Sequence, residues 1–362
     1  YDSAVKKSDA SARAFISSLA NIIEFKAYYW EREGINNLNA FHSVENLDQV
    51  QLLVSLIYGM NTSLAIPIIA RYWRPELKSF GEEDFVEALK AVSAFLILRR
   101  AATGVTSGID GDFRAIMEPS TGKGATRKFG LCSGVDHERE VLSPSELKGA
   151  LKKLLNYKLK VFDKESWIKL VVSNPLYQQS KDLVRFMLLA AGHQAIPSNN
   201  VLGGWEKEGV KLSANDKDFL NYRTWMGLDY ATVEHVAPET NPEKGWDKRL
   251  YEDAIVRHSI GNLVLLPSKE NSAIGNDGWS KKKKFYMALT ETLEKDQNIR
   301  IEEAKNEGFS FSKSTENILQ EGKNLSLLKP VRQVNDWNRE VVINRGRNIA
   351  EHCWDMVWPW LN

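Results

Sequence analysis

Cysteine is scarce in this sequence, with only two in 362 residues. Cys132 and Cys353 lie far apart and form no Cys-x-x-Cys pair. This usage argues against a disulfide framework and against a zinc site built from cysteines. Free cysteines are typical of a reducing cytoplasm, and we expect the protein to be cytoplasmic.

Long apolar runs and a strong net charge are absent as well. No run approaches the roughly 18 apolar residues of a membrane helix, and the first residues lack the pattern of a signal peptide. We therefore expect no membrane partner. The formal charge of +1 neither indicates nor excludes a polyanionic partner, because such binding needs only a local basic face. The chain starts at Tyr1 rather than methionine, which favours a piece of a longer protein.

What the sequence has is abundant apolar material, 43% of its residues, with helical spacing up to about Gln194. Apolar residues recur there every three or four positions, the period of an amphipathic helix. We predict a mainly α fold in which residues 1–196 form a helical bundle with these stripes as its core. The stripes are Phe15 to Ile23, Val50 to Met60, Phe85 to Leu96, Leu147 to Leu154, Trp167 to Val171 and Leu183 to Leu188. Residues 103–134, rich in Gly, Ser and Thr, are predicted to be an exposed, partly basic loop.

The character of the sequence changes after about Pro197, and residues 197–362 are predicted to form a second domain. A polar, turn-rich link leads into a small unit of two short strands and a helix, closed by a C-terminal helix. The predicted elements are a strand at Tyr230–Val233, a helix at Asp247–His258, a strand at Leu263–Leu266, a short helix around Asn271, and a helix at Trp337–Trp358.

Polar residues beside the two predicted strands can support phosphodiester hydrolysis. This reaction requires a base that activates water and a cation that neutralises charge on the phosphate. The first strand leads directly into Glu234 and His235, and His235 is the candidate base. Asn271 follows the second strand and can present a neutral oxygen to a hard cation such as Mg²⁺.

A series of motifs in this region resembles a known family. The series consists of Glu234-His235-x-x-Pro238, Gly261-Asn262-Leu263-x-Leu265-Leu266, Asn271 and Lys281. It resembles the C-terminal nuclease domain of GmrSD-type modification-dependent restriction enzymes and related phage-defence nucleases, a branch of the HNH or ββα-metal fold. The resemblance covers roughly Tyr230 to Lys284 and extends more weakly to the closing helix.

The resemblance implies a role for each matching residue. His235 would deprotonate the attacking water, and Asn262 would orient the catalytic loop. The implied metal is Mg²⁺ or Mn²⁺, bound by Asn271 and by Glu234, which stands where many HNH enzymes have Asp. Lys281 would be the cation near the scissile phosphate. The neighbouring Lys282, Lys283 and Lys284 would contact the DNA backbone.

The function implied is that of a metal-dependent DNA endonuclease that nicks duplex DNA as the effector of an anti-phage restriction system. The zinc-binding cysteine pairs of many HNH proteins are missing. The Asp-Gly-Gln-Gln-Arg motif of the family's nucleotide-hydrolysing N-terminal domain is missing too, so we expect that sensor as a partner outside this chain. Two alternatives stay open: a non-catalytic nucleic-acid-sensing scaffold and an RNA-cleaving nuclease of the same fold.

Other conspicuous residues have ordinary interpretations. The glycine-flanked lysine at residues 122–124 does not meet the spacing of a phosphate loop. A single histidine is usually structural, and we interpret the five histidines other than His235 in that way: His42, His137, His193, His258 and His352.

Overall fold

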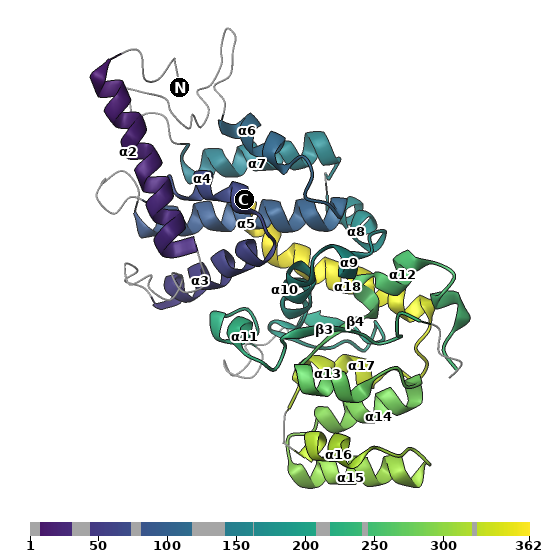
Figure 1. Ribbon diagram of the computed structural model, residues 1–362. Coiled ribbons are helices and arrows are strands. Elements are labelled where there is room, and N and C mark those ends of the chain that lie inside the picture. The colour runs from purple at the N-terminus through teal and green to yellow at the C-terminus, as the bar shows by residue number, and fades with distance from the viewer. Residues whose placement is uncertain are drawn as a thin grey trace. The chain divides into compact units, whose positions relative to one another are not determined.

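The computed structural model describes residues 8–30, 44–73, 81–117, 142–161, 163–207, 218–240, 245–320 and 324–362. These residues are mainly helical and include two small two-stranded sheets (Figure 1). The predicted fold class is therefore confirmed. Among the described residues, no helix combines the length and the apolar character needed to cross a membrane.

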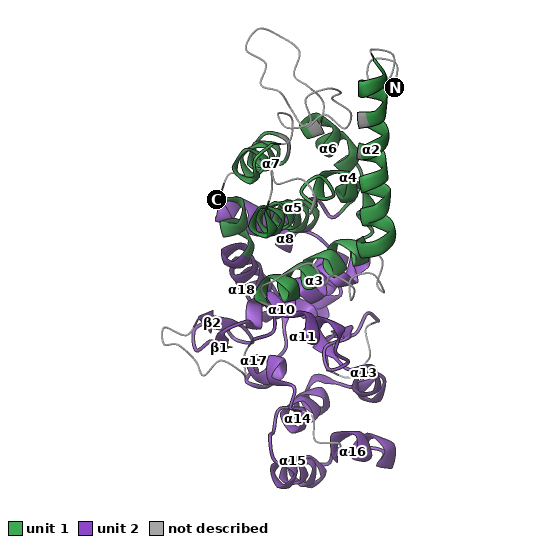
Figure 2. Cartoon of the chain, turned by 90° about the vertical axis from the view of Figure 1, so that its left-hand side faces the viewer, with its two compact units in different colours: residues 1–100, 105–162, 357–362 green, residues 101–104, 163–356 purple. Residues whose placement is uncertain are grey.

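Contacts divide the chain into two compact units (Figure 2). The first comprises residues 1–100, 105–162 and 357–362, and the second comprises residues 101–104 and 163–356. This division differs from the predicted boundary at 196/197. Helices α9 (Leu176–Gln179) and α10 (Lys181–Gly192) pack against elements that follow them in the chain, so they belong to the second unit.

The first unit is a set of helices with α5 as its most buried member. Residues Ala88 to Leu98 of α5 include a nearly unbroken series of buried apolar side chains. Near its end, Arg99 forms a buried ion pair with Asp112 at 2.7 Å. The elements are α2 (Asp9–Phe25), η1 (Lys26–Trp30), α3 (Val44–Gly59), η3 (Ser63–Ala65), α4 (Ile66–Ile69), α5 (Glu82–Thr103), α6 (Ile109–Met117), α7 (Pro144–Leu159) and η7 (Trp358–Leu361).

Two predictions for this unit are wrong. The stripe from Phe15 to Ile23 was expected in the core, but Leu19 and Ile23 are exposed, because α2 buries its C-terminal Phe25 instead. The expected loop contains helix α6, which Arg99 fixes by bonding to Asp112 and to the carbonyl oxygen of Ser107. The rest of the expected loop, with Lys123, Arg127, Lys128 and Cys132, lies outside the described residues, as do His42 and His137.

The second unit places two antiparallel hairpins among helices. Strands β1 (Ala195–Pro197) and β2 (Trp205–Lys207) form one hairpin, which the sequence did not indicate. Strands β3 (Thr232–His235) and β4 (Leu263–Leu266) form the other, with His235 opposite Leu263. The remaining elements are α8 (Lys164–Val172), α11 (Tyr222–Met226), η4 (Lys248–Leu250), α12 (Ala254–His258), η5 (Ile260–Asn262), α13 (Ser268–Ile274), α14 (Trp279–Leu289), α15 (Glu294–Asn306), α16 (Lys313–Gln320), η6 (Ser326–Leu328), α17 (Lys329–Arg332) and α18 (Arg339–Val357).

Helix α18, predicted as the closing helix, joins the two hairpins. The guanidinium of Arg345 donates to the carbonyl oxygens of Gly203, Gly261 and Leu263 at 2.8 to 2.9 Å. The amide of Asn348 pairs with both backbone groups of Trp205 in β2. These buried bonds fix the backbone around Asn262, because each carbonyl oxygen they satisfy would otherwise be buried without a partner.

Replacement of Gly261 by alanine should destabilise this junction strongly. A Cβ at residue 261 would stand 1.8 Å from the carbonyl oxygen of Val342 in α18, so helix or hairpin must shift. We expect the free energy of unfolding in urea to fall by about 3 kcal/mol, the upper part of the usual range for overpacking. Gly149→Ala, at a helical position with open space around it, is the control and should be neutral or stabilising. Equal unfolding midpoints for the two variants would contradict the close approach.

Candidate active site

Strand β3 presents different side chains on its two faces, because successive residues of a strand point to opposite sides. Thr232 and Glu234 lie on one face and are partly exposed. Val233 and His235 lie on the other face and are buried, with His235 only 3% exposed. Glu234 and His235 are neighbours at the end of β3, and their side chains project from opposite faces of the strand.

His235 meets a second histidine on its face of the hairpin. Its Nε2 atom lies 3.1 Å from Nδ1 of His258, at the end of α12. The ring of Tyr177, from α9, lies 4.1 Å from that of His235 between centroids. The carboxylate of Glu239 lies 3.9 Å from His258 Nδ1. One donor atom each from His235, His258 and Glu239 lie within 4.8 Å of one another, so they could hold a divalent metal.

The electrostatic environment keeps His235 unprotonated. Burial lowers its pKa to about 3, and the nearby basic groups of His258, Lys282, Arg257 and Lys181 act in the same direction. Burial also lowers the pKa of His258. Both rings are therefore neutral near pH 7, and one nitrogen of each ring carries a lone pair.

Acid should destabilise the protein through His235. Its pKa is lower in the folded chain than the ordinary value of 6.5, so its contribution to stability is present above pH 6.5 and is lost as the pH falls toward 3. Between pH 6.5 and 5 the loss should be on the order of 2 kcal/mol, at about 1.4 kcal/mol per pH unit. Unfolding curves of the wild type and His235→Gln at several pH values measure this. If the two proteins lost stability in parallel, the neutral buried imidazole would be excluded as the cause.

Glu234, on the other face of β3, lies beside a buried lysine. The ammonium of Lys282, in α14, is 3.6 Å from the Glu234 carboxylate and donates to the carbonyl oxygen of His235 at 3.0 Å. Burial raises the pKa of Glu234 and lowers that of Lys282, and the attraction between the two opposes both shifts. The expectation that Lys282 contacts DNA is corrected here, because its fully buried side chain bonds inside the unit.

Asn271 shares the face of β3 that carries Glu234. It lies in α13, and its side-chain nitrogen donates to the hydroxyl of Thr232 at 3.2 Å. Thr232 and Glu234 are two residues apart and point to the same side. This hydrogen bond uses the nitrogen of the Asn271 amide and leaves its oxygen for another partner.

Asn262 is completely buried and joins three segments through its side chain. Its oxygen accepts from the backbone N–H of Ala237 at 2.9 Å and from the indole N–H of Trp337 at 3.0 Å. Its nitrogen donates to the carbonyl oxygens of Ala237 and Arg257. All four bonding positions of the amide are filled, so Asn262 fixes the loop after His235 relative to α12 and to the chain before α18.

The other lysines of α14 are less buried than Lys282 and are engaged in local contacts. Lys281 forms an ion pair with Asp277 at 2.8 Å. Lys283 donates to the side chain of Asn335, and Lys284 pairs with Glu307. A phosphate group would have to compete with these partners, all of which lie near the surface.

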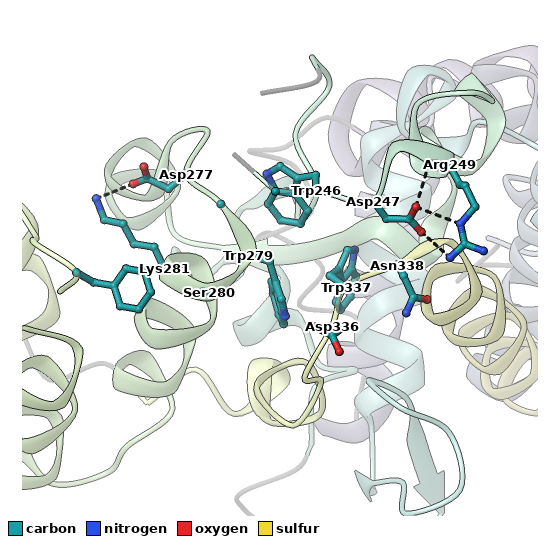
Figure 3. A pocket seen from close by; sticks show the side chains of 13 residues that line it. Trp246, Asp247, Arg249, Asp277, Trp279, Ser280, Lys281, Asp336, Trp337 and Asn338 are labelled. Atoms are coloured by element: carbon teal, nitrogen blue, oxygen red, sulfur yellow. Dashed lines mark hydrogen bonds and ion pairs between the residues drawn. The ribbon is translucent and has the colours of Figure 1, made fainter. Parts of the chain in front are cut away.

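A cavity of about 720 Å³ opens at the start of α14 (Figure 3). Lys281 lines it together with its partner Asp277, and Asp247 lines it with Arg249. Three tryptophans, at positions 246, 279 and 337, form part of the wall. Trp337 connects the cavity to the hairpin through its bond to Asn262. The cavity therefore adjoins the residues that hold the loop after His235.

Sequence reasoning missed His258, Glu239 and Tyr177 as members of this site. His258 was interpreted as structural, although it stands four residues before Asn262 inside the motif region. Glu239 directly follows the Glu-His-x-x-Pro motif and carried no separate signal. Tyr177 comes from a helix more than fifty residues upstream, and nothing in the local sequence pointed to it.

A comparison with family models defines the chain as a nuclease of the restriction-endonuclease class. The matching model describes the C-terminal domain of GmrSD restriction endonucleases and covers residues 170–352, and the chain belongs to this family. The resemblance seen in the motifs is thus confirmed. The match also includes α9 and α10, in agreement with their place in the second unit. No curated protein matches the chain significantly.

Proposed function

We propose that the chain is a metal-dependent, HNH-type endonuclease that hydrolyses DNA phosphodiester bonds as the effector of an anti-phage restriction system. The main support is the position of His235. Its imidazole ends strand β3, is neutral, and is held between Tyr177 and His258. A general base must be unprotonated and fixed in direction, and His235 has both properties.

In this proposal His235 takes the proton of the attacking water. A base with a pKa of about 3 is weak, but an approaching phosphate brings negative charge, which raises the pKa of a neighbouring imidazole. The half-buried ring of Tyr177 packs against the ring of His235. The proposal requires space beside these two rings for the attacking water. In this proposal Asn262 orients the loop after His235.

Glu234 and Asn271 fit a hard divalent cation. Both lie on the same side of β3, and the hydrogen bond from Asn271 to Thr232 leaves the amide oxygen free of that contact. Carboxylate and amide oxygens suit Mg²⁺ or Mn²⁺. The bound ion would supply charge neutralisation at the phosphate. The ammonium of Lys282 shares Glu234 and holds its carboxylate on this side of the hairpin.

DNA would approach along the surface of α14. Lys281 and Lys283 lie near the surface there, and phosphate contacts by lysine carry no sequence information. We therefore expect weak duplex binding that falls steeply with salt, and little preference for sequence.

A plasmid assay tests the proposed function. With Mg²⁺ or Mn²⁺, the purified chain should nick supercoiled DNA and leave 5′-phosphate and 3′-hydroxyl ends, and excess EDTA should stop the reaction. His235→Gln should lower the rate by at least 100-fold, within the usual contribution of a general base. His193→Gln, a second partly buried histidine of the same unit, is the control and should retain the rate.

Three results would count against the proposal. Full activity in EDTA would exclude a metal-dependent mechanism. Cleavage of RNA but not DNA would favour the RNA-specific alternative. Nucleic-acid binding without any cleavage would favour a non-catalytic scaffold.

A further inference from the structure

The proposed mechanism uses His235 as the base. It gives no chemical role to His258 and Glu239, which lie in the same cluster. We infer that these three side chains form a second metal site, selective for imidazole-preferring ions such as Zn²⁺, and that occupation of this site silences the nuclease. The site is supported by the close approach of the three donor atoms. The silencing rests on the proposed function, in which His235 is the general base.

The spacing of the two histidines suits a bound ion. Zn²⁺ holds imidazole nitrogens at about 2.0 to 2.1 Å in tetrahedral geometry, which places two ligand atoms about 3.3 Å apart. The observed separation of His235 Nε2 and His258 Nδ1 is 3.1 Å. Little change in their separation would therefore be needed, and the hydrogen that one of the two nitrogens donates in this contact would move to the other nitrogen of its own ring when the ion binds. Glu239, at 3.9 Å and with half of its side chain exposed, can rotate toward the pair.

The rings are held in place by their surroundings. Tyr177 packs against His235 and lies nearly parallel to His258, at an interplanar angle of 17°. The backbone of His235 is fixed by strand pairing and by the bond from Lys282. A site with ligands fixed in advance loses less entropy when the ion binds.

The two faces of β3 would then differ in the ions they prefer. Glu234 and Asn271 offer only oxygen atoms, which favour Mg²⁺ and Mn²⁺. His235, His258 and Glu239 offer two nitrogens and one oxygen, a donor set that suits Zn²⁺, Co²⁺ or Ni²⁺ better than Mg²⁺. Three protein ligands leave a fourth position open to water.

Silencing follows because Nε2 of His235 would be both the general base and a ligand of the ion. The Nε2 atom that faces His258 cannot accept a proton from water while it is bound to an ion. Positive groups around His235, from Lys181, Arg257 and Lys282, oppose a dication, whereas Glu239 favours one. We therefore expect reversible binding with a Kd on the order of micromolar rather than a permanent structural ion.

A binding experiment tests the site without reference to cleavage. Co²⁺ is added to the intact chain in excess Mg²⁺, the visible absorption of bound Co²⁺ is recorded, and Zn²⁺ is then used to displace it. The wild type should bind one equivalent. Glu239→Gln should bind at least 10-fold more weakly, and His258→Gln should lose the signal. Glu252→Gln, which removes an exposed carboxylate outside the cluster, is the matched control and should bind like the wild type.

A nicking experiment tests the silencing. Zn²⁺ should stop Mg²⁺-supported nicking by the wild type, with half-inhibition at the Zn²⁺ concentration that displaces half of the bound Co²⁺. Glu239→Gln should need at least 10-fold more Zn²⁺ for the same inhibition. If Glu239→Gln and His258→Gln both bound Co²⁺ and Zn²⁺ with wild-type affinity, the proposed metal site would be wrong. Tight Zn²⁺ binding with unchanged nicking would overturn the silencing. Absence of nicking under all conditions would refute the proposed function, while the Co²⁺ titration would still decide whether the site exists.

Discussion

Replacement of Asn262 by alanine is expected to abolish cleavage and to lower the free energy of unfolding by on the order of 4 kcal/mol. The side chain fills four hydrogen bonds in a completely buried position. Alanine would leave the N–H of Ala237, the indole of Trp337 and two carbonyl oxygens without this partner. Each unsatisfied buried group costs about 1 to 3 kcal/mol, partly relieved by rearrangement. Urea unfolding and the plasmid assay measure the two effects.

The matched control for Asn262 is Asn298→Ala in α15. The side chain of Asn298 is half-buried and accepts one hydrogen bond, from the side chain of Gln320. We expect this change to cost less than about 1 kcal/mol and to leave cleavage intact. If Asn262→Ala unfolded at the same urea concentration as Asn298→Ala, the loop after His235 would not depend on Asn262.

Replacement of Lys282 by methionine is the second change with a large expected effect. Methionine keeps much of the apolar volume but removes the ammonium that bonds the His235 carbonyl oxygen and neutralises Glu234. Removal of one partner from a buried pair typically costs about 3 to 5 kcal/mol, and the partial exposure of the Glu234 side chain, 19%, should keep the loss near the lower end. We also expect cleavage to fall at least 10-fold, because the end of β3 loses its fixed position.

A double-mutant cycle with Glu234→Gln isolates the role of charge. If the cost of Lys282→Met arises from an unpaired carboxylate, the double variant should recover part of the stability that the single variant loses. Lys283→Met, a neighbouring change at a partly exposed lysine, should alter stability by less than about 1 kcal/mol. Equal effects of the two lysine changes would show that burial of Lys282 does not matter.

Much of the hairpin could be predicted because its signals are local. The strand predicted at Tyr230–Val233 overlaps β3, which begins two residues later and includes Glu234 and His235, and the strand predicted at Leu263–Leu266 is β4. The closing helix, predicted at Trp337–Trp358, corresponds to α18. The helix predicted at Asp247–His258 is broken, because Asp247 and Asp253 each cap a separate short turn.

The burial of Lys282 could have been predicted from helical phase. Phe285, Tyr286 and Leu289 follow it at intervals of three, four and seven residues, which places all four on one side of α14. The four consecutive lysines look alike as a charge run, so the run was interpreted as one surface. In a helix, four consecutive residues point in four directions, and one of these lysines points into the core.

The partners of His235 could not be predicted, because they come from segments distant in the sequence. Tyr177 lies 58 positions before His235 and His258 lies 23 positions after it. Sequence periodicity reports which face of a helix is buried but not what it is buried against. The same limit explains why α9 and α10 were assigned to the helical bundle rather than to the unit that contains the hairpin.

Helix α18 also sets the order in which the nuclease can be completed during synthesis. Its Arg345 and Asn348 satisfy backbone groups of both hairpins, and these segments leave the ribosome before α18 does. Until α18 has emerged, the carbonyl oxygens next to Asn262 lack their guanidinium partner. A chain interrupted before Arg339 would therefore carry every motif residue of the centre and still lack the support that holds them, so an incomplete translation product should pose little danger to the DNA of the cell that makes it.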